Sequence, residues 1–288
     1  MKQMELFTVH PFLKWAGGKG QLLEGLLERV AAAGEFGRYH EPFVGGGALF
    51  FGLLESKRLR RNAYLSDSNQ NLVNAYVGVQ RNVEGVIELL RRHKARHSEE
   101  YFYEVRSSVP ETIEARAARI IYLNRTCYNG LYRENSRGEF NVPFGRYKNP
   151  TICDEENLRA CAKALKRAKV EQRPFETVLE SAQPGDFVYF DPPYVPVSAT
   201  SSFTSYDKEG FGEDAQRRLA EVFAELAQRG VKALLSNSDT PLVRELYSDF
   251  KIEVVYATRL VNSRADRRGK VAEVLLRNFG SPGSSVRL

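Results

Sequence analysis

The chain places a carboxylate, two prolines and a tyrosine in four consecutive positions, 191–194, directly after the apolar run GDFVYF. Two prolines stiffen the turn and remove two N–H donors, so the Pro192 carbonyl can serve as a fixed hydrogen-bond acceptor. Asp191 adds a second acceptor, and Tyr194 offers a flat face for stacking. Two acceptors beside a ring suit an aromatic amino group with two N–H donors. A turn without a ligand would need none of this polarity.

A second candidate site is the stretch EPFVGGGALFF, 41–51, where glycines lie between a predicted strand and a predicted helix. Such glycines let the backbone approach a ligand at the positive helix end. The pattern GxGxxG is incomplete, because Phe50 follows Gly45 and Gly47 where the last glycine belongs. Asp67 ends the next predicted strand, where an acid can accept hydrogen bonds from ribose hydroxyls. The combination predicts an adenosine-containing cofactor; a tight packing turn is the alternative.

The stretch KWAGGKGQL, 14–22, resembles a phosphate loop but fails the Walker A pattern. Leu13 and Gly20 stand where that pattern requires a glycine and a serine or threonine. What remains is a glycine turn before a helix, flanked by two lysines and by Trp15, the only tryptophan of the chain. A position in the hydrophobic core is the alternative for this tryptophan.

The formal net charge of +6 and the pI of about 9.1 permit a polyanionic partner. Residues 106–148 hold eight Lys/Arg against four Glu, and aromatic side chains interleave with these charges. Basic groups for phosphates beside rings for bases are typical of nucleic-acid binding, whereas a solvated basic face is the alternative. The basic residues are Arg106, Arg116, Arg119, Arg125, Arg133, Arg137, Arg146 and Lys148.

Hydrophobic periodicity predicts the elements that must position these residues, and it favours an α/β fold with a parallel sheet covered by helices. Apolar stripes predict helices after Gly20 and over 214–228, where Leu219, Val222 and Phe223 share one face with Leu226. A further helix follows the glycines of 45–47. The predicted strands are 38–43, 62–67, 185–190, 231–238, 251–259 and 271–278.

No strands are predicted between about 70 and 165, where the sequence shows helical patterns and a Gly/Asn/Pro-rich stretch. We therefore predict a catalytic domain built from 1–70 and 166–288, with an inserted, mostly helical domain at 71–165. The helices predicted within or at the end of the insert are 82–93, 113–125 and 155–168.

Other features exclude several protein classes. The three cysteines are not spaced as CxxC, which fits a reducing compartment without disulfides or structural zinc. His93 and His97 lack the glutamate of HExxH, so a solvated helix face is expected there and no metal site. No apolar run reaches about 18 residues and the N-terminus has no signal-peptide core, so a cytoplasmic protein without membrane contact is expected.

Taken together, the motifs resemble the Dam-type DNA adenine-N6 methyltransferases, which use S-adenosylmethionine. The resemblance covers about residues 12–278, and five motifs occur in the family's order. In this family DPPY marks amino methylation of a base. The fold is a Rossmann-like methyltransferase sheet with an inserted, mostly helical DNA-recognition domain. The motifs are KWAGGK, EPFVGGGA, SD at 66–67, LNRTCYNGLYRENSRGEFNVPFGRY and DPPYVPVSATSSFTSY.

The resemblance implies a role for each matching residue. Catalysis would use Asp191, Pro192 and Tyr194, with no metal ion. The cofactor pocket would be lined by Trp15, Lys19, Glu41, Phe43, Gly45, Asp67 and Asp191. DNA would be bound by Lys14, Arg125, Tyr128, Asn129, Leu131, Arg133, Asn135, Pro143 and Tyr147.

Within this set, Tyr128 and Asn129 match residues at the flipped-base site, and Lys14 matches a residue that contacts a guanine. Arg133 is the main candidate for reading the site GATC, because an arginine bidentate to guanine is a strong readout element. Leu131, Pro143 and Tyr147 match further reading positions. The implied substrate is double-stranded DNA, whose binding would associate the protein with the nucleoid. A restriction endonuclease that acts on the same site would be a functional partner, with no direct contact implied.

The implied reaction takes an adenine out of the duplex, because N6 is buried there. Hydrogen bonds from N6 to Asp191 and the Pro192 carbonyl would favour a tetrahedral nitrogen whose lone pair faces the methyl group. Alternatives are methylation of cytosine N4, RNA or a protein glutamine, and a non-catalytic nucleic-acid-binding protein on the same fold. Asp191 favours adenine among these, since related enzymes with the other substrates often carry Ser or Asn before the two prolines.

Overall fold

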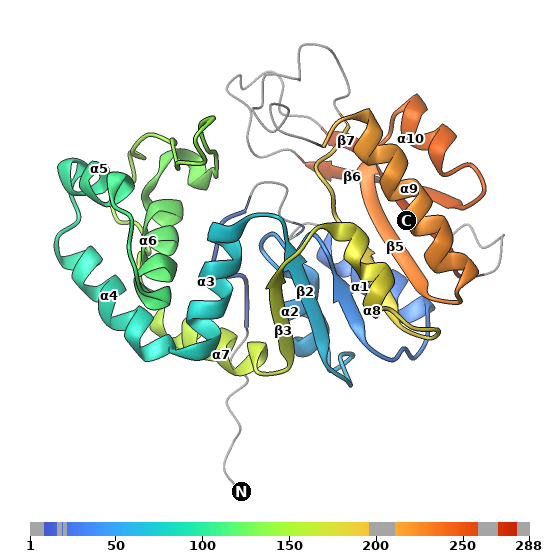
Figure 1. Ribbon diagram of the computed structural model, residues 1–288, viewed down its shortest axis with the longest axis horizontal. Coiled ribbons are helices and arrows are strands. Elements are labelled where there is room, and N and C mark those ends of the chain that lie inside the picture. Colours follow the sequence, from blue (N-terminus) through green and yellow to red (C-terminus); the bar gives the residue numbers. More distant parts are fainter. Residues whose placement is uncertain (1–8, 16–18, 20–21, 196–210, 259–269, 281–288) are drawn as a thin grey trace, which may run out of the picture. The chain divides into compact units, whose positions relative to one another are not determined.

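The computed structural model describes residues 9–15, 19, 22–195, 211–258 and 270–280. In this part the chain is a mixed α/β protein whose seven-stranded sheet has the order β3-β2-β1-β4-β5-β7-β6 (Figure 1). The predicted fold class is confirmed, and so are the predicted strands apart from small shifts of their ends. The strand β3 was not predicted. The strands are β1 (Tyr39–Glu41), β2 (Ala63–Asp67), β3 (Ala168–Gln172), β4 (Phe187–Phe190), β5 (Lys232–Ser238), β6 (Lys251–Thr258) and β7 (Lys270–Arg277).

The chain divides into two compact units, each made of two stretches of sequence. The first unit comprises Met1–Gly20 and Val44–Gln172, and the second comprises Gln21–Phe43 and Arg173–Leu288. These bounds follow the packing of the chain, whereas the predicted domain bounds follow the change from strand to helical sequence patterns. The assignment of 71–165 to DNA recognition therefore stays a prediction. None of the described helices is long and apolar enough to cross a membrane.

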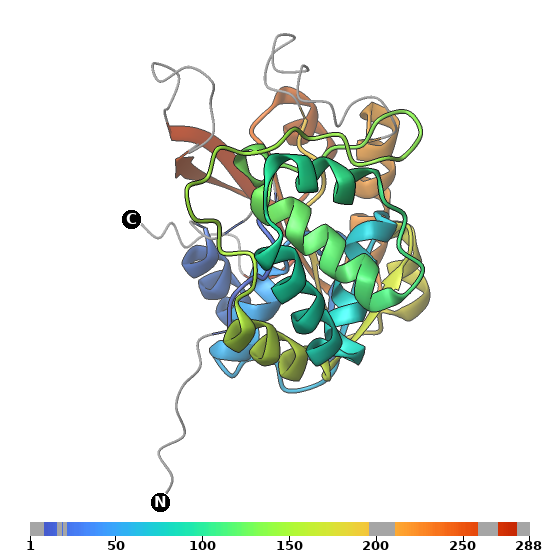
Figure 2. The same ribbon diagram turned by 90° about the vertical axis from the view of Figure 1, so that its left-hand side faces the viewer.

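The first unit is mostly helical and holds the parallel pair β2–β3. Its helix α6 packs against α3, α4 and α5 (Figures 1 and 2). Gly78 allows the close approach of α3 to α6, since a Cβ there would lie 2.4 Å from the Ala117 methyl carbon. The helices are α2 (Ala48–Glu55), α3 (Gln70–Arg81), α4 (Val83–Ala95), α5 (Glu99–Ser107), α6 (Ile113–Thr126) and α7 (Glu155–Leu165). Those from α3 to α7 each begin after a side chain that caps the first turn, in order Asn69, Asn82, Ser98, Thr112 and Asp154.

The expected solvated face at His93 and His97 holds only in part, because both side chains are half-buried against an aromatic cluster of the first unit. His93 stacks on Tyr122 with ring centroids 4.9 Å apart, and its Nδ1 lies 2.8 Å from the Tyr101 hydroxyl. His97 Nδ1 lies 3.0 Å from the Tyr122 hydroxyl. Burial, with a smaller contribution from the positive charge of Arg96, lowers the pKa of His93 to about 4, so this ring is neutral at pH 7.

The second unit contains the strands β1, β4 and β5 in parallel, followed by the antiparallel strands β7 and β6. Its core includes Leu219, Val222, Phe223 and Leu226, the predicted apolar stripe of α9, and all four are fully buried. Burying each such side chain contributes about 1.5–3 kcal/mol. The helices are α1 (Leu23–Ala32), α8 (Val178–Ser181), α9 (Glu213–Gln228) and α10 (Pro241–Leu246).

The order of the strands places a reversal between β1 and β4, which are adjacent and parallel. In open α/β sheets, ligands bind beyond the carboxyl ends of strands at such a reversal. Glu41 ends β1, and Asp191 directly follows β4. The fold therefore brings two of the predicted site carboxylates to the edge where this class of sheet binds its ligands.

The carboxylate of Asp186, directly before β4, is the centre of a buried polar network in the second unit. It accepts hydrogen bonds from the Arg38 backbone N–H at 2.8 Å, Arg38 Nε at 3.0 Å and the Gln183 N–H at 3.0 Å. His40 Nε2 lies 3.2 Å away. Burial by itself would raise the pKa of Asp186, but the hydrogen bonds from His40 and Arg38 outweigh it and hold that pKa well below its usual range.

Replacing Asp186 by asparagine should lower the free energy of unfolding at pH 7 by about 1–3 kcal/mol, because Arg38 loses a charged acceptor. Since the folded-state pKa is depressed, this stabilisation is present above the unfolded-state pKa of about 4 and is lost as pH falls below it. Urea unfolding should therefore show a smaller difference between wild type and variant at pH 3 than at pH 7. The matched control is Asp249→Asn at an exposed position. An equal difference at both pH values would contradict the assignment.

Candidate functional site

The glycine turn at 44–47 begins α2 and is shaped by two glycines with positive φ. Gly45 has φ +46° and Gly47 has φ +69°, in the left-handed region that disfavours side chains. The Gly45 N–H donates to Asp67 Oδ2 at 3.2 Å, and the Gly45 carbonyl accepts from the Tyr76 hydroxyl at 3.0 Å. The structure thus brings together the turn and the acid that the sequence predicted to act with it.

Asp67 is a carboxylate held at the end of β2 by backbone donors. Besides the bond from Gly45, its Oδ1 accepts from the Asn69 N–H at 3.0 Å. Desolvation raises the pKa of Asp67 to about 6, and hydrogen bonds from the N–H groups of Asn69, Gly45 and Ser68 offset part of this rise. An acid with such a pKa changes its charge close to physiological pH, and only its ionised form accepts hydrogen bonds through both oxygens.

Trp15 lies between this glycine turn and the segment that follows α6. Its ring lies 4.8 Å from the Tyr132 ring, with 30° between the ring planes. On the other side a Cβ at Gly45 would be 2.9 Å from Trp15 Cδ1, so the glycine is needed for this close approach. The alternative of a plain core tryptophan does not describe this position, because the ring is only partly buried. Lys19, the other predicted pocket residue of this segment, is buried.

In the second unit, the DPPY turn is fixed by polar side chains from three different elements. Gln216 of α9 donates its Nε2 to the Pro193 carbonyl at 3.0 Å. Asn237 of β5 accepts the Val195 N–H at 3.3 Å and donates to the Gln216 side chain at 3.0 Å. The Tyr194 hydroxyl donates to Glu273 of β7 at 2.8 Å. Such supporting bonds hold a reactive group in one geometry.

These supporting residues were missed by the sequence analysis, although α9 carried a signal for one of them. Gln216 lies three residues before Leu219 and seven before Phe223, so it shares their buried face, and it is 1% exposed. A polar side chain on the apolar stripe of a helix indicates a buried hydrogen-bond partner. Glu273 and Asn237 give no comparable local signal. The segment after the turn, 196–210, which carries the rest of the resembling motif, lies outside the described residues.

The site in the second unit is electronegative. Burial raises the pKa of the Tyr189 phenol well above its usual value, and the charges of Asp191, Glu41 and Glu273 raise it further. Glu41 is buried and accepts a hydrogen bond from the Tyr39 hydroxyl at 2.9 Å. Three carboxylates close enough to act on one buried phenol make a surrounding that favours a positively charged ligand.

Phe43 adds an apolar wall beside this electronegative region. Its ring stacks on Phe175 with centroids 5.3 Å apart and packs edge-on against Phe211 at 5.4 Å. Pro192 is buried, whereas Asp191 and Tyr194 keep part of their surface exposed. The predicted residues at the ends of β1 and β4 therefore combine the apolar ring of Phe43, the carboxylates of Glu41 and Asp191, and the ring of Tyr194.

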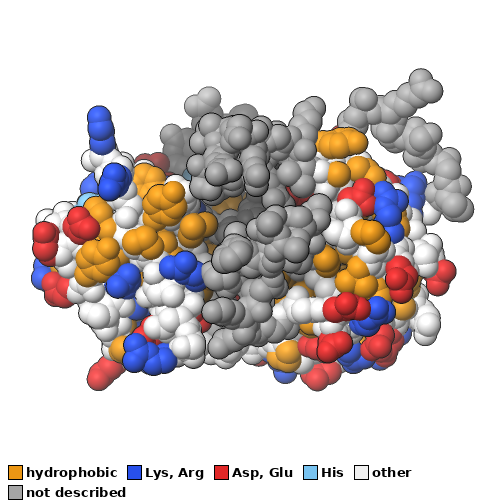
Figure 3. Space-filling model, turned by 90° about the horizontal axis from the view of Figure 1, so that it is seen from above, with side chains coloured by type: hydrophobic (Ala, Val, Ile, Leu, Met, Phe, Trp, Pro, Cys, Tyr) orange, Lys and Arg blue, Asp and Glu red, His pale blue; other side chains and the backbone are white. Residues whose placement is uncertain are grey.

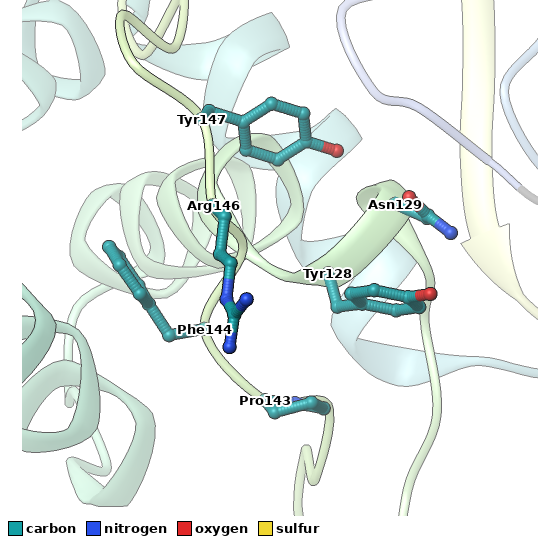
Figure 4. A pocket seen from close by; sticks show the side chains of 6 residues that line it. All are labelled: Tyr128, Asn129, Pro143, Phe144, Arg146 and Tyr147. Atoms are coloured by element: carbon teal, nitrogen blue, oxygen red, sulfur yellow. The ribbon is translucent and has the colours of Figure 1, made fainter.

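A cavity of about 460 Å³ lies in the Gly/Asn/Pro-rich segment of the first unit. Figure 4 shows aromatic, polar and basic side chains around it. Tyr128 is 49% exposed, so its ring is open to a ligand at this cavity. Hydrophobic and basic side chains lie side by side over this unit in the view of Figure 3. The lining residues are Tyr128, Asn129, Pro143, Phe144, Arg146 and Tyr147.

Four of these six were predicted as DNA-binding residues, and the structure collects them from two stretches of the chain. Two hydrogen bonds join the stretches: Tyr128 N–H donates to the Pro143 carbonyl at 2.9 Å, and Gly145 N–H donates to the Thr126 carbonyl at 2.8 Å. Phe144 and Arg146 were seen only as members of the aromatic and basic pattern, and the cavity identifies them as further candidates.

The other predicted DNA-binding residues lie outside the cavity lining. Arg133 is exposed, and its guanidinium is oriented by the side chain and the carbonyl of Asn141, at 2.6 and 3.3 Å. Asn135 accepts the Arg137 N–H and shapes its own turn. Arg125 is half-buried and donates twice to the Phe12 carbonyl. Leu131 is half-buried, and Lys14 Nζ lies 4.6 Å above the Tyr147 ring. Their contacts with DNA stay predictions.

The comparisons with known proteins identify the family of the chain. The family model of D12 class N6 adenine-specific DNA methyltransferases matches residues 15–261. The chain is 44% identical to Type II methyltransferase M1.LlaDCHI of Lactococcus lactis subsp. cremoris, over 97% of this chain and 99% of that protein. It is 43% identical to Type II methyltransferase M.MjaIII of Methanocaldococcus jannaschii, over 94% and 99%. It is 37% identical to DNA adenine methylase of Escherichia coli K12, over 92% and 93%.

A sheet of this order, with a glycine turn paired with an acid, is a Rossmann-like methyltransferase fold. The matched residues, 15–261, include parts of both units. They include every motif named above except Lys14, the first residue of KWAGGK. The chain belongs to the D12 class N6 adenine-specific DNA methyltransferase family. It is a site-specific DNA methyltransferase, and the resemblance to Dam-type enzymes is confirmed.

Proposed function

We propose that this chain transfers the methyl group of S-adenosylmethionine to N6 of an adenine extruded from double-stranded DNA within the sequence GATC. The observation that carries the proposal is the turn 191–194, whose tyrosine hydroxyl and backbone are held by Glu273 and Gln216 beside an electronegative region. GATC is supported by Arg133 and by the predicted reading residues Pro143 and Tyr147 at the cavity, and adenine as the target is supported by the similarity to a DNA adenine methylase.

The residues fit S-adenosylmethionine as the methyl donor. When bound, it supplies a methyl group on a positively charged sulfur. The ionised Asp67 carboxylate would accept hydrogen bonds from the ribose hydroxyls, beside the glycine turn that lets the backbone approach. Trp15, Lys19 and Phe43 would contact the adenosine part, and Glu41 would accept a hydrogen bond from the ligand. The carboxylates near Tyr189 suit a cationic sulfur.

The chemistry requires a better nucleophile than a free aromatic amine. The Asp191 carboxylate and the Pro192 carbonyl would accept the two N6 hydrogens and favour a tetrahedral nitrogen, with its lone pair free for attack. Tyr194 would stack on the adenine ring, while Glu273 fixes the tyrosine hydroxyl. N6 would take the methyl group with the neutral thioether as the leaving group, Asp191 would stabilise the positive charge that N6 gains, and loss of a proton from N6 to solvent would complete the transfer. Positioned acceptors of this kind supply much of a rate enhancement.

Incubation with tritiated S-adenosylmethionine and synthetic duplexes tests the proposal. A GATC duplex should gain label that nucleoside analysis assigns to N6-methyladenine, and duplexes with one altered base pair should gain far less. Binding should also weaken with rising salt, because Lys and Arg contacts with phosphates release counterions. Label in another nucleoside, or equal labelling of all duplexes, would overturn the proposed site.

Cofactor binding should depend on pH through Asp67. Because the pKa of Asp67 is raised to about 6, the carboxylate is ionised above that pH and becomes protonated below it. The dissociation constant of S-adenosylhomocysteine should therefore rise as pH falls from 8 to 5, by up to about tenfold per pH unit below 6. Calorimetric titration measures this, with Asp67→Asn as the matched variant. An Asp67→Asn protein with the same pH dependence would contradict the assignment.

A pairing with a restriction endonuclease of the same site is part of the proposal, because two of the relatives are named Type II methyltransferases. Methylation by this chain would then protect cellular DNA at the nucleoid in the cytoplasm. Plasmid DNA from cells that produce the protein should resist an endonuclease that is blocked by N6-methyladenine in GATC. Complete cleavage of that DNA would contradict this role.

A further inference from the structure

Side chains of α6 and α7 hold the backbone of the segment 10–14 at every second residue. All of these contacts lie within the first unit, and they join positions more than 100 residues apart in the sequence. The anchors, in the order of the segment, are Asn157 at His10, Arg125 at Phe12 and Asn124 at Lys14.

Asn124 makes one bond that the other anchors do not make. Its Oδ1 accepts the Lys14 N–H at 2.7 Å, and its Nδ2 donates to the Lys14 carbonyl at 2.6 Å and to the Gly130 carbonyl at 3.1 Å. The side chain is fully buried. Its orientation is fixed by chemistry, because exchanging the oxygen and nitrogen would place two donors against each other. Asn124 therefore ties Lys14 to the 3-10 turn Tyr128–Gly130.

The turn and Lys14 also touch directly. Gly130 has φ +63°, and a Cβ there would lie 2.7 Å from Lys14 Cδ and 2.9 Å from Lys14 Cβ. Only glycine permits this contact without displacement. Lys14 Nζ lies over the ring of Tyr147, and Tyr147 lines the cavity together with the turn residue Tyr128 (Figure 4).

The next residue extends the contact toward the predicted cofactor turn. Trp15 packs on Tyr132, which follows the 3-10 turn by two residues, and on Gly45 of the glycine turn. The pair Lys14–Trp15 thus contacts the candidate recognition segment on one side and the glycine turn on the other. A shift of the recognition segment would therefore move Lys14 and Trp15 against the glycine turn, because closely packed side chains leave few voids that could absorb the shift.

We propose that Asn124 is a positioning residue that couples DNA sequence recognition to the glycine turn 44–47, the predicted cofactor turn. It does so by joining the 3-10 turn Tyr128–Gly130 to Lys14 and Trp15. The inference rests on the proposed function, which assigns the turn and Lys14 to DNA. Asn124 contacts neither DNA nor cofactor in this role. Its loss therefore affects how well the correct sequence is distinguished, and leaves the residues that do the chemistry in place.

The decisive variant is Asn124→Asp. Aspartate keeps the size and the acceptor for the Lys14 N–H, but it places an oxygen against the carbonyls of Lys14 and Gly130. We expect the ratio of kcat/KM between the cognate duplex and single-base variants to fall by at least about tenfold. Fluorescence gives a second readout, because Trp15 is the only tryptophan. In the wild type we expect the emission of Trp15 to change differently on binding cognate and altered duplexes. In Asn124→Asp the two changes should be equal.

Asn157→Asp is the matched control. Asn157 accepts the His10 N–H at 3.1 Å and donates to the His10 carbonyl at 3.0 Å, so it holds the same segment by the same chemistry. It lies on α7 and is also buried, but it is not bonded to the 3-10 turn. Its discrimination ratio should stay within about twofold of wild type. A role of Asn124 in stability alone predicts that both variants behave alike.

Retention of the wild-type ratio in Asn124→Asp, or an equal loss in Asn157→Asp, overturns the proposal. If Asn124→Asp does not fold by circular dichroism, Gly130→Ala replaces it, because the added methyl displaces Lys14 from the turn while Asn124 stays intact. Discrimination must fall there too, and an unchanged ratio overturns the proposal. Failure of the proposed function is seen separately, as a wild-type enzyme inactive on GATC. The ratios are then measured on the site where methylated adenines map in plasmid DNA.

Discussion

The Asp191→Ala enzyme should transfer methyl groups about 10³-fold more slowly than wild type, because an amine held by one acceptor in place of two stays planar and unreactive. Asp191→Asn keeps one acceptor oxygen without its charge, so its rate should lie between the two. Single-turnover labelling with enzyme in excess over the duplex measures the chemical step directly. Circular dichroism and duplex binding should be close to wild type for both variants, since the DNA-binding candidates lie in the first unit.

Asp249→Asn serves as the matched control for the loss of a carboxylate, because Asp249 belongs to the same unit and is exposed. Its rate should equal that of wild type. Near-normal turnover by Asp191→Ala would remove Asp191 from the role of N6 acceptor. A large loss of duplex binding in that variant would show instead that the residue acts in binding.

The Arg133→Ala enzyme should discriminate less well between its site and single-base variants, by about 1–3 kcal/mol. The guanidinium of Arg133 is already oriented by the two bonds to Asn141, so little conformational freedom remains to be lost when it meets a base. The measurement is kcat/KM on the cognate duplex and on duplexes altered at each position of the site. The loss should be concentrated at one base pair, the one that this arginine reads.

Arg137→Ala is the matched control, since it removes the same charge from the same loop. Arg137 is exposed and forms an ion pair with Glu139 at 3.1 Å. Its loss should weaken binding slightly and equally for all duplexes, as expected of a contact without base readout. Unchanged discrimination in Arg133→Ala, or the same pattern of loss in Arg137→Ala, would exclude Arg133 as the reader.

The helical and strand patterns predicted most elements well where apolar residues dominate. The stripe of α9 and the runs at β4 and β5 are examples, and their side chains are buried as expected. The strand β3 was missed because its sequence, AKVEQ, has a single buried residue, Val170. It is the first strand in the order of the sheet, and edge strands are often short and charged. Such a strand has no clear alternation of its own.

His93 and His97 show why the expected solvated face holds only in part. In sequence, His93 and His97 stand among charged residues, and local polarity predicts exposure. The rings of Tyr101 and Tyr122 come from two other helices and cover them. Whether a half-polar side chain is buried depends on partners that local sequence does not specify.

The sequence by itself determined the family, the order of the motifs and the groups that carry the chemistry, because these depend on residue types at short spacing. Tertiary structure decided which partner each polar group meets. The Asn124 side chain reaches Lys14 across 110 residues of sequence, and the Tyr194 hydroxyl reaches Glu273 across 79. Hydrophobic patterns predict which residues are buried, but a buried hydrogen-bond donor can pair with any acceptor that the packing brings near. For that reason the supports of the site became visible only in the folded chain.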